Sequence, residues 1–144
     1  MAINICYPSL ALLAIAVMIV GCGPRSDGPK RVLVSGNVTY ANEPIVNGEI
    51  RFEPLDGKIS PVGSAIIQGS YKVSARGGVP AGSNRVVIHG YRPPPNTRMK
   101  TDSHPQSGKP AVQYVPAKYN TNSQLQITLD SEEDQKTLDF DLEP

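Results

Sequence analysis

From residue 32 onward, apolar and polar residues alternate with a period of two over several short segments of the chain. In one of them, Ile50 and Phe52 stand between the charged residues Glu49, Arg51 and Glu53. A strand turns successive side chains to opposite faces of its sheet, so this alternation predicts half-buried strands with one apolar face. The segments that show it are residues 32–40, 49–53, 71–73, 85–89, 124–129 and 137–142.

A seventh, less regular strand is expected at residues 62–67, and turn-forming residues separate the runs. Short strands bounded by such turns predict an all-β fold, a single antiparallel seven-stranded β-sandwich over residues 31–144. Its core is expected to consist of the inward-facing strand residues. Examples are Val34, Val38, Ile50, Phe52, Ile88, Ile127, Leu138 and Phe140.

A different pattern opens the chain, where the run from Leu10 to Val20 is apolar without interruption. As a helix this run would span about 16 Å, roughly half of the hydrocarbon core of a bilayer. Its length and the small and polar residues behind it are typical of a signal peptide, which we expect to occupy residues 1–21 and to be cleaved. The absence of Lys and Arg from the first nine residues departs from the usual signal-peptide pattern.

The residues around the expected cleavage point carry a first family resemblance. Ile19-Val20-Gly21-Cys22 resembles a bacterial lipobox, with an aliphatic residue three before the Cys and a small residue just before it. The resemblance implies that Cys22 is the lipidation site and that its acylated form inserts into membrane lipid. Two or three acyl chains anchor a protein firmly, because each buried CH₂ contributes about 0.8 kcal/mol. The alternative is a free Cys22 behind an ordinary signal.

Cysteine usage and the residues that follow agree with an anchor. Cys6 lies in the segment to be removed, so Cys22 is the only Cys expected in the mature chain, where an unmodified thiol would be a liability in an oxidising compartment. Residues 22–30 are expected to form a flexible tether, since nothing aliphatic or aromatic follows the Cys there. We therefore expect a membrane-anchored location in the bacterial cell envelope. Gly23 favours the outer over the inner membrane, because many bacteria use Asp at that position as an inner-membrane retention signal.

The domain carries a second resemblance, spread over motifs that follow one another in order. They are Gly36-Asn37-Val38-Thr39-Tyr40, residues 44–52, Gly69-Ser70-Tyr71-Lys72-Val73 and Pro80-Ala81-Gly82. Together they resemble the opening strands and turns of the carboxypeptidase regulatory-like, or transthyretin-like, β-sandwich. Val115-Pro116-Ala117-Lys118-Tyr119 is similar to a motif of small envelope lipoproteins built on that domain. The resemblance covers residues 31–142 and implies a fold and a location, but no reaction.

Composition narrows the class of protein further. The 144 residues predict one domain, and 14 Pro with 13 Gly argue against a helical bundle or coiled coil. A formal net charge of +1 excludes a broadly basic nucleic-acid binder, so we expect no nucleic-acid partner.

A Pro-rich connection over residues 92–111 stands out, because a loop of that length is usually functional or disordered. Its three consecutive prolines favour an extended polyproline conformation. It also carries basic side chains, which makes it a candidate binding loop for anionic polysaccharide or lipid headgroups, with a salt-sensitive attraction. Alternatively, the acidic residues of 119–144 neutralise this charge in the folded domain. The basic residues are Arg92, Arg98, Lys100 and Lys109.

The sequence offers no convincing catalytic or metal-binding set. Asp102-Ser103-His104 has the residue types of a hydrolase triad, but adjacent loop residues lack the rigid scaffold that such a triad needs. Neither His89, expected to point outward, nor His104 has a partner at metal-ligand spacing. The acidic turn at 130–134 lacks the Gly of a calcium loop and is expected to be solvated. We expect no catalytic residue, no metal and no cofactor.

These features predict a non-enzymatic, lipid-anchored envelope protein whose β-sandwich is structural or binds protein or polysaccharide. The alternative is an accessory ligand-binding subunit of an envelope enzyme or transporter, which a concave pocket lined by aromatic side chains would favour. A hydrolase in its own right is the third hypothesis. Fold-level analogy does not choose among them.

Overall fold

A computed structural model of the chain describes residues 28–93 and 111–144. The expected signal peptide, Cys22 and most of the tether lie outside these residues. So do the sequence Asp102-Ser103-His104 and three of the four basic residues of the candidate binding loop; these three are Arg98, Lys100 and Lys109. Within the described ranges, no helix is long and apolar enough to cross a membrane.

The described part of the chain is all-β, with two short 3₁₀ turns at Ala75–Gly77 and Ala117–Tyr119 as its only helical elements. It contains eleven strands, several of them only two or three residues long. They are β1 (Arg31–Tyr40), β2 (Glu43–Pro44), β3 (Asn47–Pro54), β4 (Val62–Ile67), β5 (Ser70–Val73), β6 (Val79–Pro80), β7 (Gly82–Arg92), β8 (Val112–Gln113), β9 (Gln126–Leu129), β10 (Gln135–Thr137) and β11 (Phe140–Leu142).

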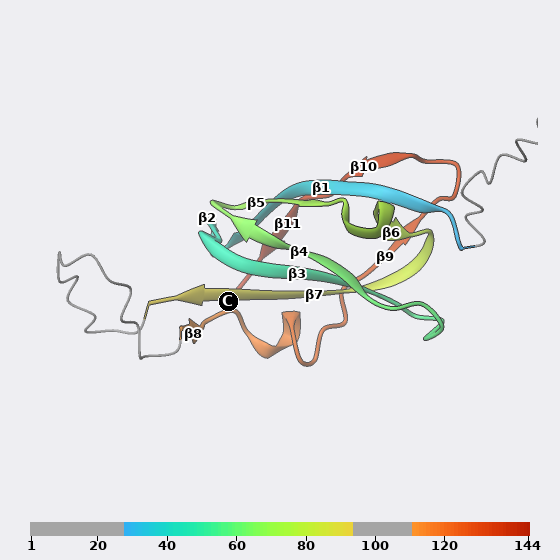
Figure 1. Cartoon of the computed structure of the whole chain (residues 1–144). Coiled ribbons are helices and arrows are strands. Elements are labelled where there is room, and N and C mark those ends of the chain that lie inside the picture. The colour runs from blue at the N-terminus through green and yellow to red at the C-terminus, as the bar shows by residue number, and fades with distance from the viewer. Residues whose placement is uncertain (1–27, 94–110) are drawn as a thin grey trace, which may run out of the picture.

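The strands form one curled sheet in the order β10-β1-β5-β4-β3-β7-β8 (Figure 1). Strands β2, β6 and β11 also pair with β1, and β9 pairs with β7. Most pairs are antiparallel, as expected from the short turns, but β10 and β11 run parallel to β1. In the view of Figure 1, β1, β5 and β10 lie toward the top and β3 and β7 below them, with β4 between, and the buried side chains of these strands form one hydrophobic cluster.

The alternating residues of the long strands build the core as predicted. On β1, Val32, Val34 and Val38 are fully buried, and on β3 Ile50 and Phe52 are fully buried. The core prediction was wrong in part for the C-terminal half of the chain, where three residues expected to be buried are only partly buried against the hydrophobic core. These are Ile127, Leu138 and Phe140.

Two tight hairpins fix the register of the sheet. Ala41 and Asn42 connect the paired residues Tyr40 and Glu43, both with positive φ (54° and 64°). The β4–β5 hairpin turns in the same way, through a residue pair ending at Gly69, which has a φ of 81°. Two left-handed residues in a two-residue loop match the twist of antiparallel strands, which explains why the turn signals seen in the sequence lie at these points.

The last expected strand, residues 137–142, is divided into β10 and β11 by Leu138 and Asp139. The break follows from hydrogen bonds that hold these two residues against the middle of β1. The Leu138 amide donates to the Ser35 carbonyl (2.8 Å), and the Asn37 amide donates to Asp139 Oδ1 (2.7 Å). The chain passes so close to β1 that a Cβ on Gly36 would lie 1.9 Å from the Leu138 carbonyl oxygen. Gly36 therefore permits a close approach of two main-chain segments, which is a common reason for a glycine inside a strand.

The two ends of the sheet are occupied by different parts of the chain. Arg31 opens β1 at one end, where it pairs with Pro80, whereas the pairings of β3 with β4 and β7 bring Asn47, Ile67 and Tyr91 together at the other end. Figure 1 shows the start of β1 and the end of β7 on opposite sides of the sheet. Strands of this length separate the two ends by about 30 Å.

Candidate functional site

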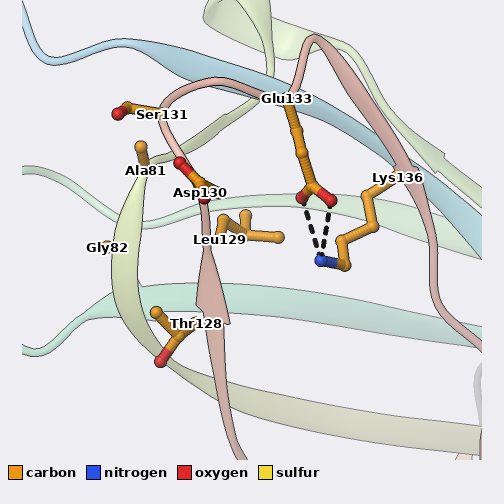
Figure 2. A pocket seen from close by; sticks show the side chains of 8 residues that line it. All are labelled: Ala81, Gly82, Thr128, Leu129, Asp130, Ser131, Glu133 and Lys136. Atoms are coloured by element: carbon orange, nitrogen blue, oxygen red, sulfur yellow. Dashed lines mark hydrogen bonds and ion pairs between the residues drawn. The ribbon is translucent and has the colours of Figure 1, made fainter.

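We consider two hollows in the described surface as candidate sites. The larger of these two has a volume of about 700 Å³ and lies at the end of the sheet where β1 begins (Figure 2). An ion pair closes one side of it, because Lys136 Nζ lies 2.9 Å and 3.1 Å from the two carboxylate oxygens of Glu133. Its lining is mainly polar and contains no aromatic side chain. The lining residues are Ala81, Gly82, Thr128, Leu129, Asp130, Ser131, Glu133 and Lys136.

The acidic turn beside this hollow is solvated, as expected. Asp134 pairs with Lys30 at 3.1 Å while its side chain stays 88% exposed, and Asp130 Oδ1 accepts a hydrogen bond from the Glu132 amide (2.9 Å). Exposed pairs of this kind contribute little to stability. The described residues contain no cluster of three His, Cys, Asp or Glu side chains able to hold a metal ion.

The second hollow is a shallow groove of about 410 Å³ on the outer face of β4, β3 and β7, at the opposite end of the sheet. Each strand contributes differently to it: β3 supplies an amide and a carboxylate, β4 supplies small side chains, and β7 supplies one aromatic ring. We call it the β4–β3–β7 groove. It is lined by Asn47, Gly48, Glu49, Gly63, Ser64, Ala65 and Tyr91.

The polar and aromatic groups of the groove are held by neighbours on the same strands. Arg51 donates from a terminal nitrogen to Glu49 Oε1 at 2.8 Å, and this hydrogen bond to Glu49 raises the pKa of the Arg51 guanidinium. The ring of Tyr91 is stacked with that of His89, with centroids 6.2 Å apart and planes within 4°. His89 thus lies on the outward face, as predicted, where it packs against an aromatic ring.

Arg92, the one residue of the predicted binding loop that the structure describes, is attached to the body of the domain. Its guanidinium lies 5.5 Å from the ring centroid of Tyr114, which in turn packs edge-on against Tyr40 at 5.8 Å. Burial raises the pKa of the Tyr114 hydroxyl. A guanidinium over an aromatic face is an attractive cation–π arrangement, so Arg92 is held at the end of β7 and does not project freely.

The segment Val115–Tyr119, noted above for its resemblance to a lipoprotein motif, has a structural role. Val115 is buried, and the hydroxyl of Tyr119 accepts a hydrogen bond from the Glu143 amide (3.0 Å). Two buried polar residues that the sequence did not single out hold this segment: Asn120 donates to the Val115 carbonyl (3.0 Å) and Ser123 donates to the carbonyl of Val86. Each satisfies a main-chain carbonyl: the Asn120 bond closes the segment on itself, and the Ser123 bond links the residues after it to β7.

Comparisons with protein-family models, with curated proteins and with solved structures give no match. The transthyretin-like and lipoprotein assignments therefore stay predictions from the sequence motifs.

The groove residues were not predicted as a site. They come from three strands that are consecutive in the sheet but spread over 45 positions of sequence, and each fits an ordinary outward strand position on its own. The one local signal is the small pair Gly63 and Ala65 at alternate positions of β4, where large β-branched residues are usual.

Proposed function

We propose that the chain is a lipid-anchored protein of the bacterial cell envelope. Its domain is structural or binds polysaccharide or protein, without catalysing a reaction. The observation that carries the proposal is the sequence Ile19-Val20-Gly21-Cys22 behind an eleven-residue apolar run. Its order, hydrophobic core then small residue then Cys, is what lipid modification of an exported chain requires.

We also propose that the curled all-β sheet is a seven-stranded sandwich of the transthyretin-like type. The motifs that suggested it fall on matching elements of the structure. Gly36 lies in the middle of β1, Gly69 in the β4–β5 turn, Tyr71 on β5, and Pro80 and Gly82 at the approach to β7. In this reading the short strands β2, β6, β8 and the division of the last strand are additions to the seven.

The arrangement of the domain supports a role in contact with something away from the membrane. A chain anchored at Cys22 reaches the domain through Arg31, at the end of the sheet that carries the larger hollow. The β4–β3–β7 groove and Arg92 lie toward the other end of the sheet. The anchor and the candidate contact surface would then face in opposite directions.

The alternative of an accessory ligand-binding subunit called for a concave pocket lined by aromatic side chains. The larger hollow has no aromatic lining, and the β4–β3–β7 groove has only Tyr91. We therefore keep the binding or structural envelope protein as the leading proposal.

Acyl labelling of two matched variants tests the anchor. In cells fed an alkyne-tagged fatty acid, the unchanged chain and Cys6→Ala should both carry the label and sediment with membranes. Cys22→Ala should lose the label and accumulate as an uncleaved precursor. Equal labelling of Cys22→Ala and Cys6→Ala would contradict the proposal.

A further inference from the structure

We propose that the β4–β3–β7 groove binds an uncharged glycan, with one pyranose ring stacked on Tyr91 and its hydroxyl groups bonded to the polar side chains of β3. The inference deepens the proposed function, on which it rests, by naming the class of ligand and the residues that contact it.

The floor of the groove is flat because its backbone leaves no room for side chains. On β4, a Cβ at Gly63 would lie 2.4 Å from the Ile50 carbonyl oxygen, so no side chain rises from the strand at that point. Gly48 is buried, and a Cβ there would meet the core side chains of Ile45 and Ile66. Ala65, the remaining small residue, is exposed. A rigid, flat ligand such as a sugar ring can therefore lie directly against the strands.

The wall of the groove is an aromatic ring with a fixed orientation. Tyr91 stands parallel to His89 on the same strand, and Tyr91 is not part of the hydrophobic core cluster. An aromatic face attracts the C–H groups of a sugar ring through its quadrupole and through burial of apolar surface, while the phenol hydroxyl stays wet. A ring already held by its neighbour loses little freedom when a ligand packs on it.

The polar groups of the groove match hydroxyl groups better than they match charges. Glu49 uses Oε1 to accept from Arg51, and among the described residues its Oε2 has no hydrogen-bond partner. The exposed Asn47 amide adds both donors and an acceptor at the same surface. Ser64 is paired with the buried Ile50, and its hydroxyl donates to the Ala65 carbonyl (3.2 Å). Glu49 is the single charged residue among those that line the groove, and its pairing with Arg51 leaves no net charge to attract an anionic polymer.

An extended peptide is the competing occupant, because it could pair with main-chain groups of a strand. The groove, however, opens on the face of the sheet, where strand side chains point, and β4 already pairs with β3 along its whole length. A face-on groove with one aromatic wall and a polar floor favours the glycan.

Binding to the full-length chain in detergent micelles tests the proposal, measured by titration calorimetry. The probes are maltohexaose, cellohexaose and chitohexaose as uncharged glycans, and polygalacturonate as an anionic one. We expect at least one uncharged hexasaccharide to bind, with an affinity that changes less than about twofold between low and high salt, since no ion pair forms.

Three variants assign the binding to the groove. Tyr91→Ala should weaken it about tenfold, the upper range for losing an aromatic contact. Ala65→Gln should block it by filling the floor from an exposed position. Leu55→Ala, an exposed residue that follows β3 at the end away from Asn47, is the matched control and should leave the affinity unchanged.

Several results would overturn the proposal. They are that no uncharged hexasaccharide binds, that polygalacturonate binds in their place, or that a strand-forming peptide displaces the bound glycan without contacting Tyr91. Equal binding by Tyr91→Ala and Leu55→Ala would also overturn it. The same experiments distinguish a failure of the proposed lipid anchor from a failure of the proposed glycan site. A chain labelled at Cys22 that binds none of the uncharged glycans refutes only the groove, whereas a chain that binds them but is never acylated refutes only the anchor.

Discussion

Adding a single methyl group at Gly36 should detach the C-terminal residues from β1. In Gly36→Ala, the new Cβ would fall 1.9 Å from the Leu138 carbonyl oxygen, whereas such contacts are essentially never closer than 3.0 Å. Leu138 must therefore move away by about 1 Å. The neighbouring atom is main chain, so no side-chain rotation can relieve the overlap.

The cost follows from the hydrogen bonds that this movement breaks. Leu138 donates to Ser35 and accepts from the Tyr71 hydroxyl, both at 2.8 Å, and Asp139 Oδ1 accepts from the Asn37 amide at 2.7 Å. Each such bond contributes about 0.5–1.5 kcal/mol net, so losing all three lowers the free energy of unfolding by about 1.5–4.5 kcal/mol.

Urea denaturation of the full chain measures this change, and hydrogen exchange locates it. In Gly36→Ala the amide of Leu138 should lose its protection, because the bond to β1 is broken. Gly28→Ala is the matched control, since a Cβ there meets nothing within 4 Å, and its free energy of unfolding should stay within about 0.5 kcal/mol of the unchanged chain. If Gly36→Ala is as stable as Gly28→Ala, the close approach of the C-terminal residues to β1 is wrong.

Three further predictions follow from burial, from protonation and from charge. Phe52→Ala should lower the free energy of unfolding by about 3–5 kcal/mol and the partly buried Phe140→Ala by clearly less, so equal losses in urea would contradict the assigned burial. Burial raises the pKa of Tyr71, so the folded state holds the phenol proton more tightly than the unfolded chain does. The free energy of unfolding should therefore fall as the pH rises above about 10, the pKa of an unfolded Tyr. Tyr71→Phe has no such proton, so in alkaline denaturation it should lose less stability over this pH range than the unchanged chain. Binding of polygalacturonate through the candidate binding loop should weaken steeply as the salt concentration rises. Both the affinity and its salt dependence should drop when the four basic residues are changed to Ser. If neither changes, the loop does not bind the polymer and only connects two strands. The four are Arg92, Arg98, Lys100 and Lys109.

The period-two alternation was sufficient to predict the long strands and their inward faces. The alternation predicts β1, β3 and β7 well because each of these strands has one face on the core and one face on solvent. Buried and exposed residues therefore alternate along the sequence of each strand. The hairpin turns were equally visible, since Asn42 and Gly69 are residue types that tolerate the left-handed conformation required there.

The alternation within one segment could not predict which segments far apart in the sequence pair with each other in the sheet. The parallel pairing of β10 and β11 with β1 joins residues about a hundred positions apart, and the division between them depends on the contact of Leu138 with Gly36. The β4–β3–β7 groove was missed for the same reason. Its shape depends on which outward residues of three strands become neighbours, and on the open space left above Ala65, neither of which the sequence of one strand contains.

The position of β1 also determines how the domain would respond to mechanical load. β1 is the first strand after the expected anchor, and it is bordered by β5 on one side and by β10 and β11 on the other. A pull between the membrane and a ligand at the far end of the sheet would act along β1, across ladders whose hydrogen bonds run from strand to strand. Those bonds would share the force in shear and would not open one after another. Tension on the bound polymer would then be transmitted to the anchor through an intact domain.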